Sequence, residues 1–226
     1  MKRIAVIGLG RFGTKLAMAL SMSGAEVIAI DRDRESVEDI RDQVAHAVRM
    51  DSTEIDALRS QGVDKADAAV VGMAQGGSAF ESAVMTIVNL KELGVPKIYA
   101  RAASVTMGRV LTAVGATEVI YPENETAQRW AYKLIAPHIT DKIAFAPGYS
   151  LASVKAPASF DGRTIMELQL RQKYNVNLVA IQRAEPKKFG ESHDTITVPA
   201  PDTVIYSADV LMIAGSDDEI ARLPRE

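Results

Sequence analysis

Short apolar runs alternate with amphipathic segments of helical length over the first 136 residues. Six apolar runs of strand type lie at 3–8, 26–31, 46–51, 67–73, 97–102 and 118–122. Helical segments lie between them at 11–23, 34–43, 53–61, 78–93 and 104–115. Strands that alternate with helices are typical of parallel sheets with crossover connections. The pattern therefore predicts an α/β fold with a doubly wound, mostly parallel Rossmann-type sheet.

A further helix, at 123–137, follows the sixth strand and carries the only tryptophan. Its apolar members include Trp130, Leu134 and Ile135, more than one sheet edge can cover, so the helix is expected to expose an apolar patch. Ordinary core packing is the alternative.

From about residue 140 the pattern becomes shorter, alternating and rich in turns. It predicts strands at 149–156 and 176–183, a short helix at 164–174, and two or three more strands with a small terminal helix within 195–223. The chain thus divides into a first domain at 1–122, a helix and linker at 123–140, and a second domain at 141–226. The second domain is expected to be small, α+β and mainly antiparallel.

A glycine-rich turn joins the first strand to the first helix. Its sequence is Gly8-Leu9-Gly10-Arg11-Phe12-Gly13. In such a motif the first glycine makes a tight turn, the second lets backbone approach a phosphate, and the third lets helix and strand pack closely. The free N–H groups and the dipole of the helix N-terminus favour an anion. A nucleotide-binding turn is the prediction.

An acidic residue stands where such a site needs one. Asp31 ends the second strand, 18 residues after Gly13, where a carboxylate can accept hydrogen bonds from ribose hydroxyls. The same carboxylate repels a 2′-phosphate, although Arg32 leaves an opening for one. A solvated loop carboxylate is the alternative, because the segment "DRDRE" is charged throughout and Asp33 can cap the next helix.

Polar residues also follow three other predicted strands. Asp51, Ser52 and Thr53 follow the third strand on the adenine side of the crevice, where they can contact the ligand, cap the N-terminus of the next helix, or do both. Arg101 ends the fifth strand and Glu123 follows the sixth, so both are expected to face the phosphate crevice. Glu123 alternatively serves as a first-turn acid of its helix.

Composition narrows the class of protein. The 226 residues are 47% hydrophobic and 24% charged, with a net charge of −3, which suits a globular protein and gives nucleic acid no basic stripe to bind. No cysteine is present, which excludes disulfides, cysteine-based zinc sites and a thiol nucleophile, and fits a reducing cytosol. No run reaches the roughly 18 apolar residues of a membrane span.

Catalytic motifs are missing beside this nucleotide motif. The three histidines, His46, His138 and His193, are scattered, and no Tyr-x-x-x-Lys pair, HExxH, GxSxG or Walker A sequence occurs. A nucleotide bound without chemistry is the ligand of a sensor. A small NAD-dependent oxidoreductase with an unrecognised substrate site remains the alternative, as does a nucleotide sensor for an unrelated transporter.

Together these segments resemble the RCK family, the cytosolic gating subunits of bacterial potassium uptake systems of the Trk and Ktr type. The matching segments, in order, are "GLGRFG" at 8–13, "AIDRDRE" at 29–35, "DST" at 51–53, "ELGVPKIYARA" at 92–102 and "VLTAVGATEVIYPENETA" at 110–127. A second domain of the family's C-terminal type covers 142–226, best matched by "GRTIMELQLRQKYNVNLVAIQR".

The resemblance implies a regulatory protein that binds NAD(H) or the adenine nucleotides ATP and ADP, with Arg11 on the ligand's phosphates and, in some members, a divalent cation at the acid matching Glu123. It implies dimerisation through the helix at 123–136 and assembly into a ring, commonly an octamer. The ring's partner is a potassium-translocating membrane subunit of the TrkH or KtrB type, so the protein is expected to be cytoplasmic and peripheral on the inner membrane face. Some relatives bind cyclic di-AMP in the second domain, at places like Arg171 and Asn177.

Overall fold

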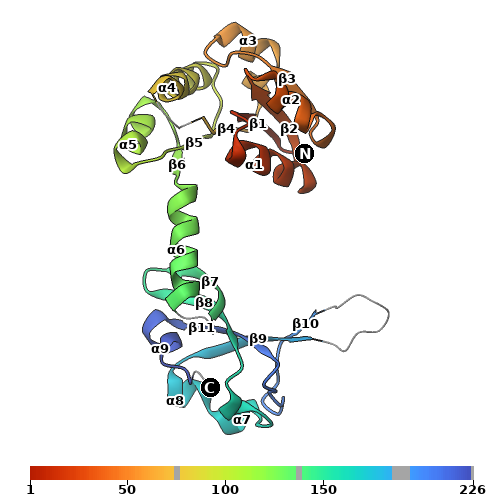
Figure 1. Cartoon of the computed structure of the whole chain (residues 1–226), viewed down its shortest axis with the longest axis vertical. Helices are drawn as coiled ribbons and strands as arrows, with labels where there is room; N and C mark the ends of the chain where they lie inside the picture. Colours follow the sequence, from red (N-terminus) through yellow and green to blue (C-terminus); the bar gives the residue numbers. More distant parts are fainter. Residues whose placement is uncertain (74–76, 136–138, 185–193, 225–226) are drawn as a thin grey trace. The chain divides into compact units, whose positions relative to one another are not determined.

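The computed structural model of the chain describes residues 1–73, 77–135, 139–184 and 194–224 (Figure 1). His138 and His193 lie outside the described residues. The chain divides into two compact units, Met1–Glu125 and Thr126–Glu226. No helix in the described part combines the length and the apolar character that crossing a membrane requires.

The first unit is built on a six-stranded sheet whose neighbouring strands all run parallel, in the order β3-β2-β1-β4-β5-β6. The predicted doubly wound fold is confirmed. Its strands are β1 Arg3–Ile7, β2 Glu26–Asp31, β3 His46–Arg49, β4 Ala68–Val71, β5 Ile98–Arg101 and β6 Glu118–Ile120.

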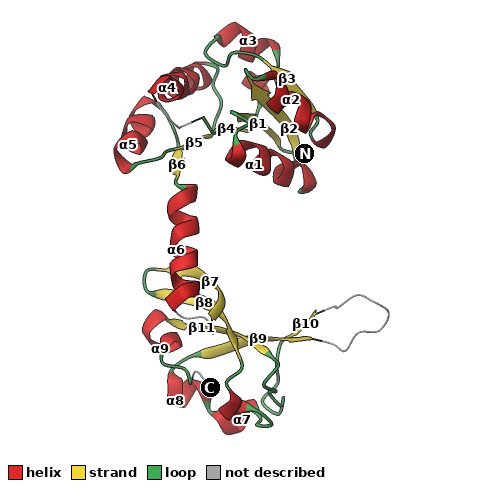
Figure 2. Ribbon diagram, viewed as in Figure 1, coloured by secondary structure: helices red, strands yellow, loops and turns green. Residues whose placement is uncertain are grey.

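Helices cover both faces of this sheet (Figure 2). Within β1, Val6 packs with Ala17 of α1 and Val37 of α2, whereas Ile7 packs with residues of α3, α4 and α5 on the opposite face. A strand buried on both faces is apolar at every position, which explains the unbroken run "IAVI". The helices are α1 Arg11–Met22, α2 Arg34–Ile40, α3 Ile55–Ser60, α4 Gly77–Glu92, α5 Val105–Val114 and α6 Pro122–Ile135, with 3₁₀ turns η1 Arg41–Gln43 and η2 Val63–Lys65.

One glycine sets how closely α5 approaches the segment after β6. A Cβ added to Gly108 would lie 1.9 Å from the hydroxyl oxygen of Tyr121, which immediately precedes α6. Any side chain at position 108 would therefore displace either the helix or the tyrosine ring.

The second unit contains a five-stranded sheet in the order β10-β9-β11-β8-β7, with every neighbouring pair antiparallel. The predicted small antiparallel α+β fold is confirmed. Strand β7 was not among the predicted strands, because residues 143–146 at its end are all exposed and give no alternation. The strands are β7 Ile139–Ala146, β8 Tyr149–Lys155, β9 Asn177–Ala184, β10 Asp194–Thr197 and β11 Val210–Ser216.

The single helix predicted at 164–174 is wrong, because the structure has two. Helices α7 Ile165–Leu168 and α8 Leu170–Tyr174 meet at Gln169, whose φ is 48°. Leu168 and Leu170 are both buried in the core of this unit. Residues two apart point about 200° from each other on one helix, so the left-handed break at Gln169 lets both face the core. The remaining helical elements are η3 Ala158–Phe160 and α9 Asp217–Ala221.

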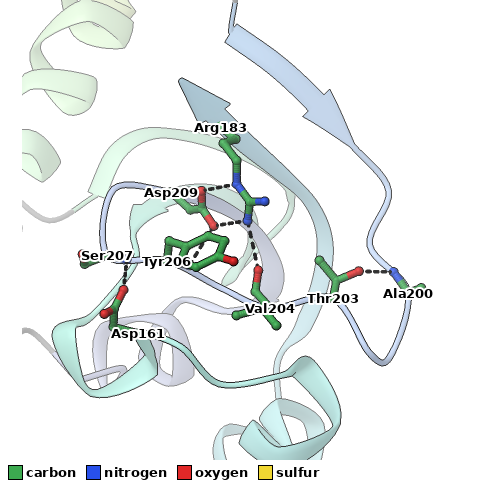
Figure 3. Close-up of polar contacts among 8 residues, drawn as sticks. All are labelled: Asp161, Arg183, Ala200, Thr203, Val204, Tyr206, Ser207 and Asp209. Carbon is green, nitrogen blue, oxygen red and sulfur yellow. Dashed lines mark hydrogen bonds and ion pairs between the residues drawn. The ribbon is translucent and has the colours of Figure 1, made fainter. Parts of the chain in front are cut away.

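An ion pair holds the segment that leads into β11 (Figure 3). Arg183 of β9 donates from Nε and one Nη to the two carboxylate oxygens of Asp209, at 2.8 and 2.7 Å, and to the carbonyl oxygen of Val204 at 2.9 Å. Its guanidinium lies 4.6 Å from the ring centroid of Tyr206, whose N–H also donates to Asp209. Burial raises the pKa of Asp209, but the bonds from Arg183 and Tyr206 outweigh burial and hold the pKa below its ordinary value.

Candidate functional site

The glycine-rich turn lies at the carboxyl edge of the first sheet, where the strand order reverses between β1 and β4. Open α/β sheets bind ligands at this position. Gly8 has a φ of 93°, and its N–H donates to the carbonyl oxygen of Ile30 at 2.8 Å. A Cβ added to Gly13 would lie 1.9 Å from the carbonyl oxygen of Gly8. These two glycines therefore serve the tight turn and the close packing of α1 on β1.

Gly10 differs from both, because no atom of the described residues, apart from Gly10 and its two chain neighbours, lies within 4 Å of the place where its Cβ would stand. Its φ of −68° and ψ of −176° suit any residue, so the fold itself does not require glycine there. Helix α1 begins at the next residue without a side-chain cap and without an acid in its first turn. Arg11 is exposed at that first position, and Phe12 is half-buried behind it. The uncapped N–H groups and the added positive charge make this end a place for an anion.

Three charged residues from separate elements interact at the carboxyl edge of the first sheet. Arg101, buried at the end of β5, forms an ion pair with Glu123 in the first turn of α6. The pKa of Glu123 lies below its ordinary value, first because of its own backbone N–H and then because of the Arg101 hydrogen bond. The positive charges of Arg101 and Arg11 lower that pKa further. Arg101 and Glu123, the two residues predicted to face the phosphate crevice, thus form an ion pair whose carboxylate is also influenced by the charge of Arg11.

Asp31 ties the glycine-rich turn to the end of β2. Its Oδ2 accepts from the N–H of Leu9 at 2.6 Å and its Oδ1 from the N–H of Asp33 at 2.9 Å. Asp33 in turn caps α2 by accepting from the N–H of Ser36 at 2.9 Å, as its alternative role predicted. Each carboxylate oxygen of Asp31 keeps further acceptor capacity, so the fixed carboxylate can also receive ribose hydroxyls.

Strand β3 ends next to Asp31. The N–H of Met50 donates to the carbonyl oxygen of Asp31 at 2.9 Å, and Nε of Arg49 donates to that of Arg32 at 3.2 Å. Arg32 is itself exposed. The order of the strands therefore places the turn over β1, Asp31 at the end of β2, and the segment after β3 one step further out.

The segment after β3 folds back on itself. Asp51 accepts from the N–H of Thr53 at 2.9 Å and from its hydroxyl at 2.7 Å. These two bonds hold the pKa of Asp51 below its ordinary value, and the charge of Arg32 lowers it further. Helix α3 begins after Glu54 without a side-chain cap, so the alternative of N-capping by Asp51, Ser52 or Thr53 is wrong. The Asx turn formed with Thr53 already supplies hydrogen bonds to the Asp51 carboxylate before the helix begins.

The Ser52 side chain is buried rather than free at the surface of the crevice. Its hydroxyl shares a hydrogen bond of 2.8 Å with the hydroxyl of Thr86 in α4. Nδ2 of Asn89, one turn further along α4, donates to the carbonyl oxygen of Thr53 at 2.8 Å. Sequence reasoning missed these two α4 residues. Two polar residues three positions apart within the apolar stretch "AVMTIVNL" were the available signal, since polar side chains on a buried helix face need partners.

The two second-domain residues predicted to bind a second ligand, Arg171 and Asn177, lie six positions apart on two successive elements, α8 and β9. Arg171 is exposed in α8, and Asn177 is exposed at the start of β9. Tyr174 and Val176 between them belong to the core of that unit. Among the residues that the structure describes, no group of three or more His, Asp or Glu side chains is placed to hold a metal ion.

Comparisons with known proteins give a consistent result. Residues 4–122 match the TrkA-N domain family, and residues 150–225 match the TrkA-C domain family. The Ktr system potassium uptake protein C of Bacillus subtilis is 33% identical over 224 residues, which cover 99% of this chain and 96% of that protein. The Ktr system potassium uptake protein A of the same organism is 32% identical over 225 residues, covering 100% and 96%.

A solved structure of the GsuK channel bound to NAD has a similar fold. Its TM-score is 0.62 at 17% sequence identity, and the match covers 97% of this chain and 38% of the channel chain. At this identity the likeness shows a common fold.

Proposed function

The chain belongs to the family of potassium uptake proteins built from a TrkA-N and a TrkA-C domain, and we propose that it is a nucleotide-sensing regulatory subunit of a potassium transporter. In this proposal residues 1–122 bind the nucleotide, residues 123–140 connect the domains, and residues 141–226 form a second regulatory domain. The protein acts at the cytoplasmic face of the membrane through a membrane-embedded, potassium-translocating partner, and it binds its nucleotide without catalysis.

The observation that carries the proposal is the open space above Gly10 at an uncapped, acid-free helix N-terminus. In the part of the chain that the structure describes, no residue beyond the two chain neighbours approaches the Cβ position and explains the glycine, and Arg11 places a second positive charge where the helix dipole is already positive. Without an anion, that arrangement is unfavourable for the helix. A bound phosphate accounts for both features at once.

The ligand class is NAD(H) or an adenine nucleotide, ATP or ADP. The ordered Asp31 carboxylate suits ribose hydroxyls, which all of these carry, and it disfavours the 2′-phosphate of NADP. A related fold in the GsuK channel binds NAD. Differences among the candidate nucleotides lie at the phosphate end, beside Arg11, Arg101 and Glu123.

A divalent cation enters the proposal only together with ATP. Arg101 already engages the Glu123 carboxylate, so a bare cation there would compete with a guanidinium. Phosphate oxygens bring the oxygen ligands that Mg²⁺ prefers, and Glu123 can add one carboxylate oxygen. The expected role of the cation is to bridge phosphate and Glu123.

Gating requires more than one site. A charge-assisted hydrogen bond from Arg11 to a phosphate contributes about 1.5–3 kcal/mol. Moving a gate from mostly closed to mostly open takes about 5.5 kcal/mol of differential binding. Several identical sites in a ring supply this sum where one does not.

The exposed side chains of Trp130, Leu134 and Ile135 on α6 support dimerisation through that helix, with a ring, commonly an octamer, as the full assembly.

The second domain is proposed to bind a second ligand, with cyclic di-AMP as the candidate. Arg171 can contact a phosphate and Asn177 can hydrogen-bond a base edge, and both side chains are exposed. Titration of the Arg171→Ala and Asn177→Ala variants with cyclic di-AMP tests this part separately.

Isothermal titration calorimetry with ADP, ATP and NADH tests the first-domain site. Arg11→Ala and Asp31→Ala are each expected to weaken binding about tenfold or more. Arg109→Ala, an exposed arginine of α5, is the matched control and should leave binding unchanged. Unchanged affinity in both site variants would refute the proposal, as would robust turnover of NADH with hydroxy acids or aldehydes.

A further inference from the structure

Helix α4 carries two polar side chains on the face that it buries. Thr86 is 0% exposed and Asn89 is 7% exposed, and they lie three residues apart, so they occupy the same side of the helix. Their neighbours on α4, including Ala83, Ile87 and Leu90, belong to the apolar core. Burying a hydroxyl or an amide is unfavourable unless it is hydrogen-bonded, so these side chains need specific partners.

Their partners lie in one short segment after β3, here called the β3 loop, residues 51–54. The hydroxyls of Thr86 and Ser52 lie 2.8 Å apart. Nδ2 of Asn89 donates to the carbonyl oxygen of Thr53 at 2.8 Å and approaches that of Ser52 at 3.5 Å. Within the loop, Asp51 accepts from Thr53 and Glu54, and at its end the carbonyl oxygen of Glu54 accepts from the N–H of Leu58 in α3. The two α4 residues therefore attach the loop to the body of the domain.

The position of the β3 loop relative to the proposed nucleotide follows from the sheet order. The glycine-rich turn lies over β1, the Asp31 carboxylate ends β2, and the β3 loop comes next along the same edge. A nucleotide with its phosphates over β1 and its ribose over β2 extends its base toward β3. Whether the base contacts the β3 loop then depends on how far the loop extends beyond the sheet edge. The hydrogen bonds from Thr86 and Asn89 of α4 fix that distance.

We propose that Thr86 and Asn89 are positioning residues that hold the β3 loop against the nucleobase and so set which base the site prefers, without touching the ligand themselves. This inference rests on the proposed nucleotide site and deepens it. A shift of about 1 Å in a binding loop is enough to change affinity and selectivity strongly. Two buried hydrogen bonds from one rigid helix restrict such a shift.

The experiment compares ADP with GDP on the full chain by calorimetry, with inorganic pyrophosphate as a probe that reaches only the glycine-rich turn. Asn89→Leu and Thr86→Val remove the polar groups with little change in volume. Each is expected to weaken ADP binding about tenfold and to lower the preference for ADP over GDP, with pyrophosphate binding unchanged. Thr86→Ser keeps the hydroxyl that Thr86→Val removes, and it is expected to keep the wild-type preference for ADP over GDP. Ser82→Ala is the control, because the Ser82 hydroxyl donates to the carbonyl oxygen of Ser78 within α4.

A structural role alone would give a different result. Partial unfolding would lower the fraction of competent protein and affect ADP, GDP and pyrophosphate alike, with the preference for ADP unchanged, and that result would overturn the inference. Unchanged ADP affinity and preference in both variants would also overturn it. If the wild-type chain binds none of ADP, ATP, NADH and pyrophosphate, the nucleotide site itself is refuted, and this inference with it. Because Thr86→Val exchanges the hydroxyl for a methyl group and Thr86→Ser removes only the methyl group, the comparison stays decisive even if Asn89→Leu does not fold.

Discussion

Replacing Gly10 with alanine should separate the stability of the first unit from its ability to bind phosphate. Among the described residues beyond its two chain neighbours, the added methyl group meets no atom within 4 Å, whereas the same change at Gly13 places a Cβ 1.9 Å from the carbonyl oxygen of Gly8. The two glycines are three residues apart in one motif, and their surroundings predict opposite phenotypes. Gly10→Ala is therefore the perturbation, and Gly13→Ala is its counterpart.

The stability of Gly10→Ala should stay close to that of the wild type. Alanine at a compatible backbone conformation reduces the entropy of the unfolded chain and stabilises by about 0.4–1 kcal/mol. Gly10 is also the N-cap residue of α1, where alanine is less favourable than glycine by a similar amount, roughly 0.5–1 kcal/mol. These effects oppose each other, so we expect a net change within about 1 kcal/mol in urea denaturation. Gly13→Ala should cost about 1–3 kcal/mol or more, because backbone must move.

ADP binding, unlike stability, should be strongly weakened in Gly10→Ala. The methyl group of Gly10→Ala occupies the space through which a phosphate approaches the first N–H groups of α1. Loss of one charge-assisted hydrogen bond, about 1.5–3 kcal/mol, corresponds to a 10- to 150-fold rise in Kd for ADP measured by calorimetry. A Gly10→Ala protein that is stable and binds ADP with wild-type affinity would refute the reasoning, because the open space would then have no ligand to accommodate.

Two further predictions concern packing and charge away from the phosphates. Arg183→Met leaves the Asp209 carboxylate, 1% exposed, without its guanidinium, and should lower the free energy of unfolding by about 3 kcal/mol in urea denaturation followed by Trp130 fluorescence. Because this pair lowers the pKa of Asp209, its contribution is present above about pH 4 and is lost as the pH falls through the lowered pKa, so wild type and variant should converge in acid. Gly108→Ala should cost about 1–3 kcal/mol through its contact with the Tyr121 hydroxyl, and less in a Tyr121→Phe background; equal costs in both backgrounds would contradict that contact.

The sheet of the first unit could be predicted because its signals are local. Each strand such as "IAVI" is buried on both faces and therefore apolar throughout, and glycines with positive φ, among them Gly24, Gly62 and Gly94, end the helices before the next strand begins. The charged groups at the carboxyl ends of β2 and β5 follow from the same strand assignments. The contact of Arg101 with Glu123 follows as well, because Arg101 ends β5, Glu123 follows β6, and these two strands are neighbours in the sheet.

Features that depend on distant partners could not be predicted. The break at Gln169 arises because Leu168 and Leu170 both enter a core formed largely by strands elsewhere in the second unit. The direction of the Ser52 side chain is decided by Thr86, 34 residues further along the chain. Local capping preferences suggested a different role for that serine, and a tertiary hydrogen bond between buried groups prevailed.

The two backbone hydrogen bonds to Asp31 have a consequence for what such a site can report. A carboxylate that is already immobilised by Leu9 and Asp33 loses almost no conformational freedom when a ribose binds, so its contribution is a constant shared by every ribonucleotide. A constant contribution raises occupancy but carries no information about which nucleotide is present. Information about the number and charge of the phosphates resides at the other end, where Arg11 projects from a helix terminus with no acid in its first turn and responds to the charge that arrives there.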